Sequence, residues 1–335
     1  MQRWLEQALT KDSQASAAAR AKALEALAWL ADVQYDMDRA EAAAEEGLRL
    51  SEEAGIRGSL AASLRNILGD VALTRGDHER ARELLEESLA LRQKVGDRRF
   101  VPRVLAFLGN LSIEQEDYEQ AKELYEESLA LARDLGDTTA LSIDLGNLGY
   151  IFLLEGEHER AMTLFEEAAA LSRERKHRSM LVHAIDNWGW AALLLRGDYE
   201  RAKVMYEESL VLCRELGEKV IASERLEGLA CLSAAEGEAE RAASLFGAAE
   251  ALREAVAFRH SPQEDAWREP YLLMTRSRQG EAAWEEALTQ GGGLWDWRKL
   301  SSTLSLPRSP PPQGSRPAQR PVGIPPGSHL GRMRY

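Results

Sequence analysis

Hydrophobic positions recur along residues 1–290 with the three- and four-residue spacing of amphipathic helices, and the whole pattern returns about every forty residues. One clear copy runs Gly-Asp-His-Glu-Arg-Ala from Gly76, followed by Leu-Leu-Glu-Glu-Ser-Leu from Leu84. One alanine marks the same position in every copy: Ala40, Ala81, Ala121, Ala161, Ala202 and Ala242. The steps between these marker alanines are 41, 40, 40, 41 and 40 residues. The pattern therefore predicts a chain built of similar helix pairs.

Helix boundaries follow from glycines and acids at fixed positions of the repeat. The first helix of a pair is expected to end at a glycine such as Gly76, Gly156 or Gly197, since glycine adopts the left-handed conformation that stops a helix. The acid that follows, as at Asp77, is a good N-cap for the second helix. A second set of glycines closes that second helix: Gly55, Gly96, Gly136 and Gly217.

Side-chain size also repeats. The small marker alanine lets the two helices of a pair approach closely. A large residue four positions later lies on the same helix face and is expected to fill the layer beneath. These large residues are Leu85, Tyr125, Phe165 and Tyr206.

Leu68-Gly69, Leu108-Gly109 and Leu148-Gly149 each lie 12 residues before a marker alanine. With the large residue four positions after that alanine, this spacing resembles the tetratricopeptide repeat (TPR), lengthened by about six residues. The resemblance covers residues 1–258 and implies a right-handed α-solenoid of about six and a half helix hairpins. The tryptophan of the family's first helix is mostly leucine in this chain, as at Leu24, Leu145 and Leu226.

Both ends of the repeat array differ from its middle. Residues 3–9 align with the second helix of a repeat whose first helix is absent, so either the protein extends further or another chain covers that end. Residues 259–290 are expected to form a helical capping segment. Together with the last repeat they resemble the C-terminal cap of repeat arrays in LuxR-type and STAND-like signalling ATPases of bacteria, where the repeats act as a sensor arm. The chain has no G-x-x-x-x-G-K-[ST] motif for the ATPase module of such proteins.

The last segment has a different composition. Eight of the 11 prolines and seven lysines or arginines against one acid fall in residues 291–335, which predicts a disordered tail. The whole chain has a net charge of −13, so the body is strongly acidic and would repel a phosphate backbone. We expect no direct nucleic-acid binding. No signal peptide or membrane-spanning run is evident, and two cysteines in 335 residues suggest a reducing compartment, so the expected location is the cytoplasm.

No catalytic pattern stands out, and the chain is expected to be neither an enzyme nor a cofactor- or metal-binding protein. His78-Glu79 and His158-Glu159 lack the second histidine of a zinc-protease motif, and no G-x-S-x-G occurs. Cys213 and Cys231 lie on apolar helical stretches and are expected to be buried. Paired acids at one repeat position predict a solvated face: Glu86-Glu87, Glu126-Glu127, Glu166-Glu167 and Glu207-Glu208. The basic cluster Arg173, Arg175, Lys176 and Arg178 is either an ordinary charged turn or a site for an acidic partner.

In the TPR architecture, first-helix residues line a concave groove that meets the ligand. By register, the resemblance places ten residues there: Trp29, Asn66, Asp70, Arg103, Asn110, Tyr150, His183, Asp186, Trp190 and Glu227. Aromatic rings give a large contact area and amides can bond a peptide backbone, so this mixture suits a protein segment. Alternatively, the aromatic residues pack between repeats and Asn66 and Asn110 cap neighbouring turns.

The sequence therefore predicts a protein- or peptide-binding scaffold or sensor within a bacterial transcription-regulatory or signalling system. Its partner is expected to be a peptide or protein segment in the groove, and an ATPase or DNA-binding regulator chain is a further candidate. The alternative is a free-standing TPR adaptor or peptide sensor unconnected with transcription. Composition alone also leaves open whether the chain forms one long array or two compact domains.

Overall fold

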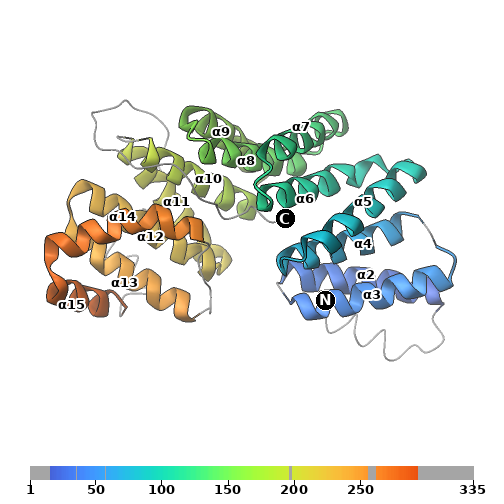
Figure 1. Cartoon of the computed structure of the whole chain (residues 1–335), viewed down its shortest axis with the longest axis horizontal. Coiled ribbons are helices and arrows are strands. Elements are labelled where there is room, and N and C mark those ends of the chain that lie inside the picture. The colour runs from blue at the N-terminus through green and yellow to red at the C-terminus, as the bar shows by residue number, and fades with distance from the viewer. Residues whose placement is uncertain (1–15, 35, 57, 196–197, 256–261, 293–335) are drawn as a thin grey trace. The chain divides into compact units, whose positions relative to one another are not determined.

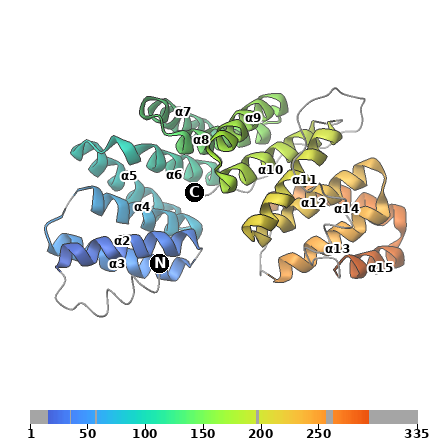
Figure 2. The same ribbon diagram turned by 180° about the vertical axis from the view of Figure 1, so that it is seen from behind.

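The computed structural model describes residues 16–34, 36–56, 58–195, 198–255 and 262–292. Every regular element in these ranges is a helix (Figures 1 and 2). The helices are α2 (Ala17–Val33), α3 (Met37–Glu53), α4 (Ser59–Thr74), α5 (His78–Val95), η1 (Arg98–Phe100), α6 (Val101–Glu114), α7 (Tyr118–Leu135), α8 (Thr138–Leu154), α9 (His158–Arg175), α10 (Arg178–Leu194), α11 (Tyr199–Leu216), α12 (Lys219–Glu236), α13 (Ala239–Ala255), α14 (Pro262–Gln279) and α15 (Glu281–Gly292). The expected all-α, TPR-like solenoid of helix hairpins is confirmed.

Two compact units make up the chain, Met1–Asp144 and Leu145–Arg334, and the boundary falls inside α8. We call them the N-terminal and the C-terminal unit. In the N-terminal unit, α2 pairs with α3, α4 with α5 and α6 with α7. In the C-terminal unit, α9 and α11 pack on α10, α12 pairs with α13, and α15 packs on α13.

The turns within and between hairpins have the expected chemistry. Asp36, Asp77 and Asp117 accept a hydrogen bond from the backbone N–H three residues later, which satisfies one free donor of the helix start. Glycines with a positive φ end most of the described helices as predicted, whereas Gly197 lies outside the described residues. At Glu116 and Lys176 a non-glycine residue takes this conformation, with φ of 63° and 57°. The turn at Lys176, within the basic cluster, therefore keeps the backbone conformation of the glycine turns.

Close helix contacts pair a glycine with a large residue. A Cβ placed on Gly109 would lie 2.7 Å from the ring of Tyr125, and one on Gly149 would lie 2.9 Å from the ring of Phe165. Gly69 meets Leu85 in the same way, at 2.8 Å. All six marker alanines are fully buried. The marker alanines and the large residues are buried, as the repeat predicts. The structure adds that the large side chain of the second helix fills the space that the glycine leaves on the first.

The C-terminal end of the described chain is closed by α14 and α15, within the segment expected to cap the array. Gly247 on α13 and Gly291 on α15 lie against the backbone of the opposite helix, at Leu288 and Ser244 respectively. Helix α15 continues to Gly292, so the predicted tail begins at least two residues later than position 291. The rest of that tail, and the half-repeat predicted at the N-terminus, lie outside the described residues.

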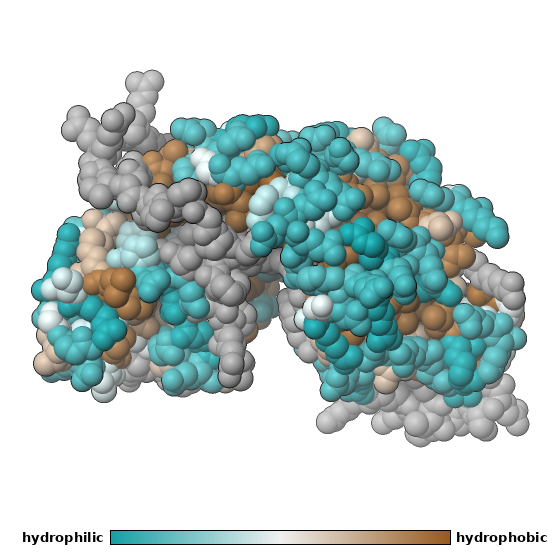
Figure 3. Space-filling model, viewed as in Figure 1, coloured by the Kyte–Doolittle hydropathy of each residue, from teal (hydrophilic) through white to brown (hydrophobic). Residues whose placement is uncertain are grey.

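Hydrophilic residues cover most of the described surface on the face in Figure 3, and hydrophobic residues show in separate patches. Three of the acid pairs are exposed, as the solvated-face interpretation requires. Glu207 and Glu208 are half-buried instead, and Glu208 binds Arg173 at 2.7 Å, so this fourth pair does not fit the prediction. Burial raises the pKa of Glu207.

Candidate functional site

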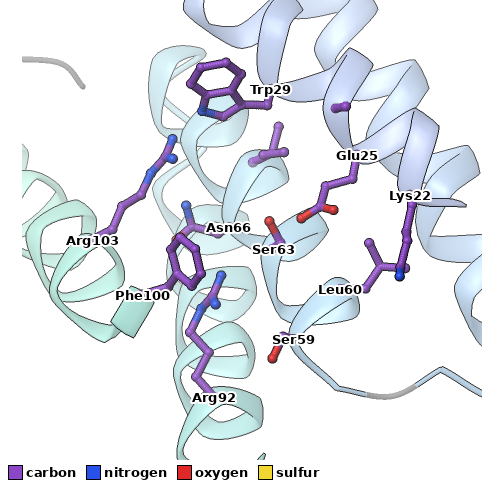
Figure 4. Close-up of a pocket in the computed structure, with 12 residues that line it drawn as sticks. Lys22, Glu25, Trp29, Ser59, Leu60, Ser63, Asn66, Arg92, Phe100 and Arg103 are labelled. Carbon is purple, nitrogen blue, oxygen red and sulfur yellow. The ribbon is translucent and has the colours of Figure 1, made fainter. Parts of the chain in front are cut away.

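The N-terminal unit contains a pocket of about 490 Å³ (Figure 4), formed by α2, α4, the end of α5, η1 and the start of α6. It brings together three predicted groove residues, Trp29, Asn66 and Arg103, from three successive first helices. The other lining residues are Lys22, Glu25, Ala26, Ser59, Leu60, Ser63, Ile67, Arg92 and Phe100. The first helices therefore do share a ligand-sized hollow in this unit.

Two aromatic rings in the pocket lining are exposed. Trp29 is 44% exposed and Phe100 is 45% exposed, although the chain buries most of its other large hydrophobic residues. The guanidinium group of Arg92 lies 5.0 Å from the centre of the Phe100 ring, and that of Arg99 lies 5.6 Å from it. These cation–π contacts hold the Phe100 ring in place while part of it stays open to a ligand.

Pro102 explains where Phe100 lies. Proline has no N–H, so residue 102 cannot donate the helical hydrogen bond to the carbonyl of Arg98. The α-helix accordingly begins at Val101, and residues 98–100 form a short 3-10 turn. In the next repeat, with no proline at this position, α8 already begins at Thr138. The 3-10 turn carries the exposed Phe100 ring to the rim of the pocket.

Buried polar atoms also line the pocket. Asn66 is 3% exposed and Arg92 is 4% exposed. Within the described part of the chain, Oδ1 of Asn66 accepts no hydrogen bond and Nε of Arg92 donates none. Each buried polar atom left without a hydrogen bond costs about 1–3 kcal/mol, and both of these atoms have almost no accessible surface. In Figure 4 the Asn66 amide lies between Trp29 and Phe100.

Three cations and one acid line the pocket: Lys22, Arg92 and Arg103 against Glu25. Arg92 is paired with Asp97 at 2.9 Å, and Arg103 lies 4.0 Å from Asp32. Neither aspartate lines the pocket. Burial lowers the pKa of Arg92 and Asp97 acts in the opposite direction, but an arginine remains protonated at neutral pH.

The start of α4 faces the same pocket through Ser59 and Leu60. Its N-cap is Gly58, which has no side chain to accept from the first turn of the helix. The N–H groups of that turn and the positive end of the helix dipole favour an acceptor or an anion nearby. The pocket thus combines two aromatic rings, a primary amide and cationic side chains, two of which have an acidic neighbour outside the lining.

The remaining predicted residues of the N-terminal unit do not line the pocket. Asp70 is buried on α4, one turn beyond Asn66. Asn110 is buried on α6, where its side-chain oxygen accepts a hydrogen bond from the hydroxyl group of Tyr125 at 2.6 Å. Asn66 and Asn110 both lie inside helices, so the alternative that they cap turns is not what the structure shows.

In the C-terminal unit, three predicted residues belong to buried charge networks. Arg225 is 1% exposed and pairs with Asp186, and also with Glu224 at 3.2 Å. His183 lies near Arg225, and burial together with this positive charge lowers its pKa to about 4. Glu227 binds Arg253 at 2.9 Å and Arg268 at 3.2 Å, joining α12 to α13 and α14. Asp186 and Glu227, which were predicted to line the groove, therefore form ion pairs between helices.

Tyr150 and Trp190 are almost completely buried, with exposed fractions of 3% and 7%. Trp190 packs edge-to-face against Tyr206, with ring centres 6.3 Å apart. Both rings are therefore packed between helices, which was the alternative to a position in the groove. Whether any of the ten predicted residues contacts a partner stays a prediction.

A family model for the tetratricopeptide repeat matches residues 59–134 and again residues 100–174. Residues 59–174 are therefore similar to tetratricopeptide repeats. The matched residues extend from α4 to α9 and include most of the residues that line the pocket. Trp29 and the rest of α2 precede the matched region. No curated protein matches the chain.

Solved structures show the same TPR-like fold. BtubC from P. vanneervenii aligns with a TM-score of 0.56 at 22% identity, over 67% of this chain and 94% of that chain. The STAND protein with a tetratricopeptide repeat sensor from Pyrococcus horikoshii has a TM-score of 0.54 at 15% identity, and the match covers 84% of this chain but 40% of that one. Rap protein complexed with Competence and Sporulation Factor has a TM-score of 0.54 at 15% identity, over 91% and 89% of the two chains. At these identities the likeness establishes the fold alone.

Sequence reasoning missed Arg92 and Phe100. Arg92 belongs to a second helix, which the TPR register does not place in the groove, and Phe100 lies outside the α-helices. The available signal for Phe100 was the proline at position 102. Cys213 and Cys231 are buried, as expected. Among the described residues, no three metal-ligating side chains lie together, and none of the helices has the length and hydrophobicity of a membrane span.

Proposed function

We propose that this chain binds a segment of a partner protein, and that the pocket between α2, α4 and α6 is where that segment docks. The observation that carries the proposal is the joint placement of Trp29, Asn66 and Phe100 around one hollow. Large aromatic side chains that a partner covers contribute much of the binding energy at protein interfaces. The match to tetratricopeptide repeats supports the same kind of role.

The proposed setting is a bacterial transcription-regulatory or signalling system, in the cytoplasm, with an ATPase or DNA-binding chain as a further partner. Its support is the STAND sensor among the similar structures and the likeness of the C-terminal segment to the cap of such sensor arms. The second candidate is a free-standing adaptor. The Rap complex supports this candidate, since there a chain of similar fold, covered over 89% of its length, holds a separate factor.

The proposed role is binding and includes no catalysis. The two thiols of the chain support this, because burial raises the pKa of Cys213 to about 12 and raises that of Cys231 as well, which disfavours the reactive thiolate. His183, with a pKa near 4, is neutral at physiological pH. Turnover abolished by changing His183 or Asp186 would contradict this part of the proposal.

The test is a selection of random 12-residue peptides on the full-length chain, followed by affinity measurements on the peptides obtained. We expect Trp29→Ala to weaken their binding about tenfold or more, as for an interface anchor. Leu135→Ala is the matched control, because Leu135 is a 39% exposed apolar residue that does not line the pocket. Peptides that bind equally well to all three proteins would place the site elsewhere and overturn the proposal.

The setting requires a separate measurement. Co-purification of an ATPase or DNA-binding chain with the native protein, lost in Trp29→Ala, supports the regulatory setting. A stable complex with an unrelated partner, and no such chain, supports the adaptor.

A further inference from the structure

Asp97 and Asp137 occupy the same position in two successive repeats, but their carboxylates have different partners. Asp137 accepts hydrogen bonds from the backbone N–H groups of Thr139 and Ala140, both at 3.1 Å, and so caps the start of α8. The side chain of Asp97 makes no such cap at the start of η1. It accepts a hydrogen bond of 2.9 Å from Nη1 of Arg92 instead. The acid that caps a helix in one repeat therefore binds an arginine in the other.

Arg92 is itself an exception to the repeat. It lies 11 residues after its marker alanine, Ala81, and the other repeats up to α11 have a small, buried residue there: Ser51, Ala132, Ser172 and Cys213. Arg92 is also buried, and its long side chain reaches the pocket between α2, α4 and α6. A buried guanidinium group needs a counter-charge, since an unpaired buried charge is costly. Asp97 supplies it, as Glu227 does for Arg253 at the same position of the last repeat, at 2.9 Å.

Phe100 is the third exception in this repeat. Its counterpart 40 residues later, Ala140, lies inside α8 and is buried, whereas Phe100 lies in η1 and is exposed. The guanidinium group of Arg92 lies 5.0 Å from the centre of the Phe100 ring. In Figure 4 the end of the Arg92 side chain lies beside that ring at the pocket. The arginine therefore contacts both the acid and the ring.

These three residues form one series of contacts, from Asp97 through Arg92 to Phe100. A free arginine side chain samples many rotamers, so its contact with a ring is well defined only where a second group fixes the guanidinium. The planar guanidinium can donate to a carboxylate from its edge while its face lies on an aromatic ring. Asp97 does not line the pocket, so an effect of this residue on binding has to pass through Arg92.

We infer that Asp97 is a positioning residue for the pocket of the N-terminal unit. By fixing Arg92 it holds the Phe100 ring at the pocket, where a side chain of the ligand packs on the exposed part of the ring. Binding then does not have to order the ring, which lowers its entropic cost. The inference rests on the proposed function and adds to it a residue that does not contact the ligand.

The position of the ring is tested on the full-length chain labelled with 4-fluorophenylalanine. The chain has six phenylalanines, so its fluorine NMR spectrum is simple, and Phe100→Leu assigns the signal of position 100. We expect Asp97→Asn to move this signal toward that of the denatured chain. The signal of the fully buried Phe165 should stay unchanged, which shows that the variant is folded.

Asp134→Asn is the matched control. Asp134 pairs with Arg98 of the same 3-10 turn, at 3.5 Å, rather than with Arg92. The substitution removes the same charge next to the same turn, and the Phe100 signal should stay where it is.

Affinity is measured with the tightest peptide of the Trp29-dependent set. We expect Asp97→Asn to weaken its binding about two- to fivefold, the factor that corresponds to one cation–π contact at an exposed ring. Arg92→Ser introduces a residue type that two other repeats have at this position, so it removes the buried charge together with its need for Asp97. It should move the Phe100 signal in the same way and weaken binding at least as much. In that background Asp97→Asn should have no further effect, because the two residues act through one interaction.

An unchanged Phe100 signal in Asp97→Asn, an unchanged affinity, or a loss of affinity that adds to that of Arg92→Ser would overturn the inference. If Asp97→Asn does not fold, Arg92→Ser decides by the same two measurements. A failure of the proposed function is distinguishable from these outcomes. If no selected peptide depends on Trp29, the docking site is wrong, whereas the fluorine signal still reports whether Asp97 positions the ring.

Discussion

The hydroxyl group of Tyr125 donates a hydrogen bond of 2.6 Å to the side-chain oxygen of Asn110, and both residues are buried. Register placed Asn110 in the ligand groove, while Tyr125 was expected in the core. The bond connects α6 to α7 within one hairpin. Part of the hydrogen-bonding capacity of Asn110 is therefore already used inside the fold.

Asn110→Ala should lower the free energy of unfolding by about 1–3 kcal/mol, because it leaves the buried Tyr125 hydroxyl group without this acceptor. Chemical denaturation monitored by circular dichroism measures the change. Glu126→Ala on the exposed face of α7 is the control and should change stability by less than about 0.5 kcal/mol. If Asn110→Ala leaves the stability unchanged and weakens peptide binding, Asn110 contacts the ligand rather than stabilising the fold.

Trp190→Ala should behave as a core truncation. The ring is 7% exposed and packs against Tyr206, so its removal should cost about 3–5 kcal/mol. Denaturation gives the stability, and peptide affinity is measured under conditions in which the variant is still folded. A stable variant with at least tenfold weaker binding would show that Trp190 is an anchor for the partner.

Asp144→Asn should stabilise the chain at neutral pH. Asp144 is fully buried beside the Ser128 hydroxyl group, at 2.5 Å, and burial raises the pKa of its carboxyl group well above the usual value. The folded state therefore holds this proton to a higher pH than the unfolded state, whose pKa is about 3.9. The contribution of Asp144 to stability is complete below about pH 4 and is lost as pH rises toward the folded pKa.

The measurement is the difference in unfolding free energy between Asp144→Asn and the natural chain, from pH 3 to pH 8. We expect a difference near zero at the acid end, growing to about 1 kcal/mol or more at neutral pH. A difference that is constant with pH would mean that Asp144 titrates normally in the folded protein.

Lys176→Gly should raise the free energy of unfolding by about 0.5–1 kcal/mol. Lys176 has a φ of 57°, and glycine adopts this conformation without the steric cost that a Cβ imposes, although it gains freedom in the unfolded chain. Gly136→Ala, at the equivalent turn with a φ of 66°, is the reciprocal change and should destabilise the chain. If Lys176→Gly lowers stability, contacts of the lysine outweigh the strain.

Gly247→Ala should loosen α15. A Cβ at this position would collide with the backbone of Leu288, and backbone atoms cannot move aside as a flexible side chain can. We expect amide hydrogen exchange in residues 281–292 to become at least tenfold faster. Ala243→Gly, a buried site on the same helix, controls for a general weakening of α13. Unchanged exchange would show that the two helices tolerate a wider separation.

The helical hairpins could be predicted from the sequence because their determinants are local and repeated. The marker alanines, the turn glycines and the large residues at Tyr125 and Phe165 each recur at one position, and each plays the same physical role in the structure. Glu116 and Lys176 kept the turn without glycine, which shows that the helices on either side can impose a backbone conformation that the residue itself disfavours.

The candidate site could be predicted only in part. Register placed Trp29, Asn66 and Arg103 on the groove side of three successive first helices, and in the structure all three line one pocket. It could not distinguish a buried residue such as Tyr150 from an open one such as Trp29, because exposure depends on side chains from other helices. The position of Phe100 depends on Pro102, which has no counterpart in the other repeats. A prediction based on what the repeats share cannot include a feature of one repeat.

The pairing of glycine with a bulky residue limits how repeats of this protein can be exchanged. Tyr206 lies against Gly189 and also against Gly228, so one phenol ring fixes two helix separations at once. A chimaera that imports the tyrosine without both glycines, or the glycines without the tyrosine, would meet either a collision or a void. A segment exchanged between such proteins therefore has to include Gly189, Tyr206 and Gly228 together. These residues lie on three successive helices, so the segment is longer than one hairpin.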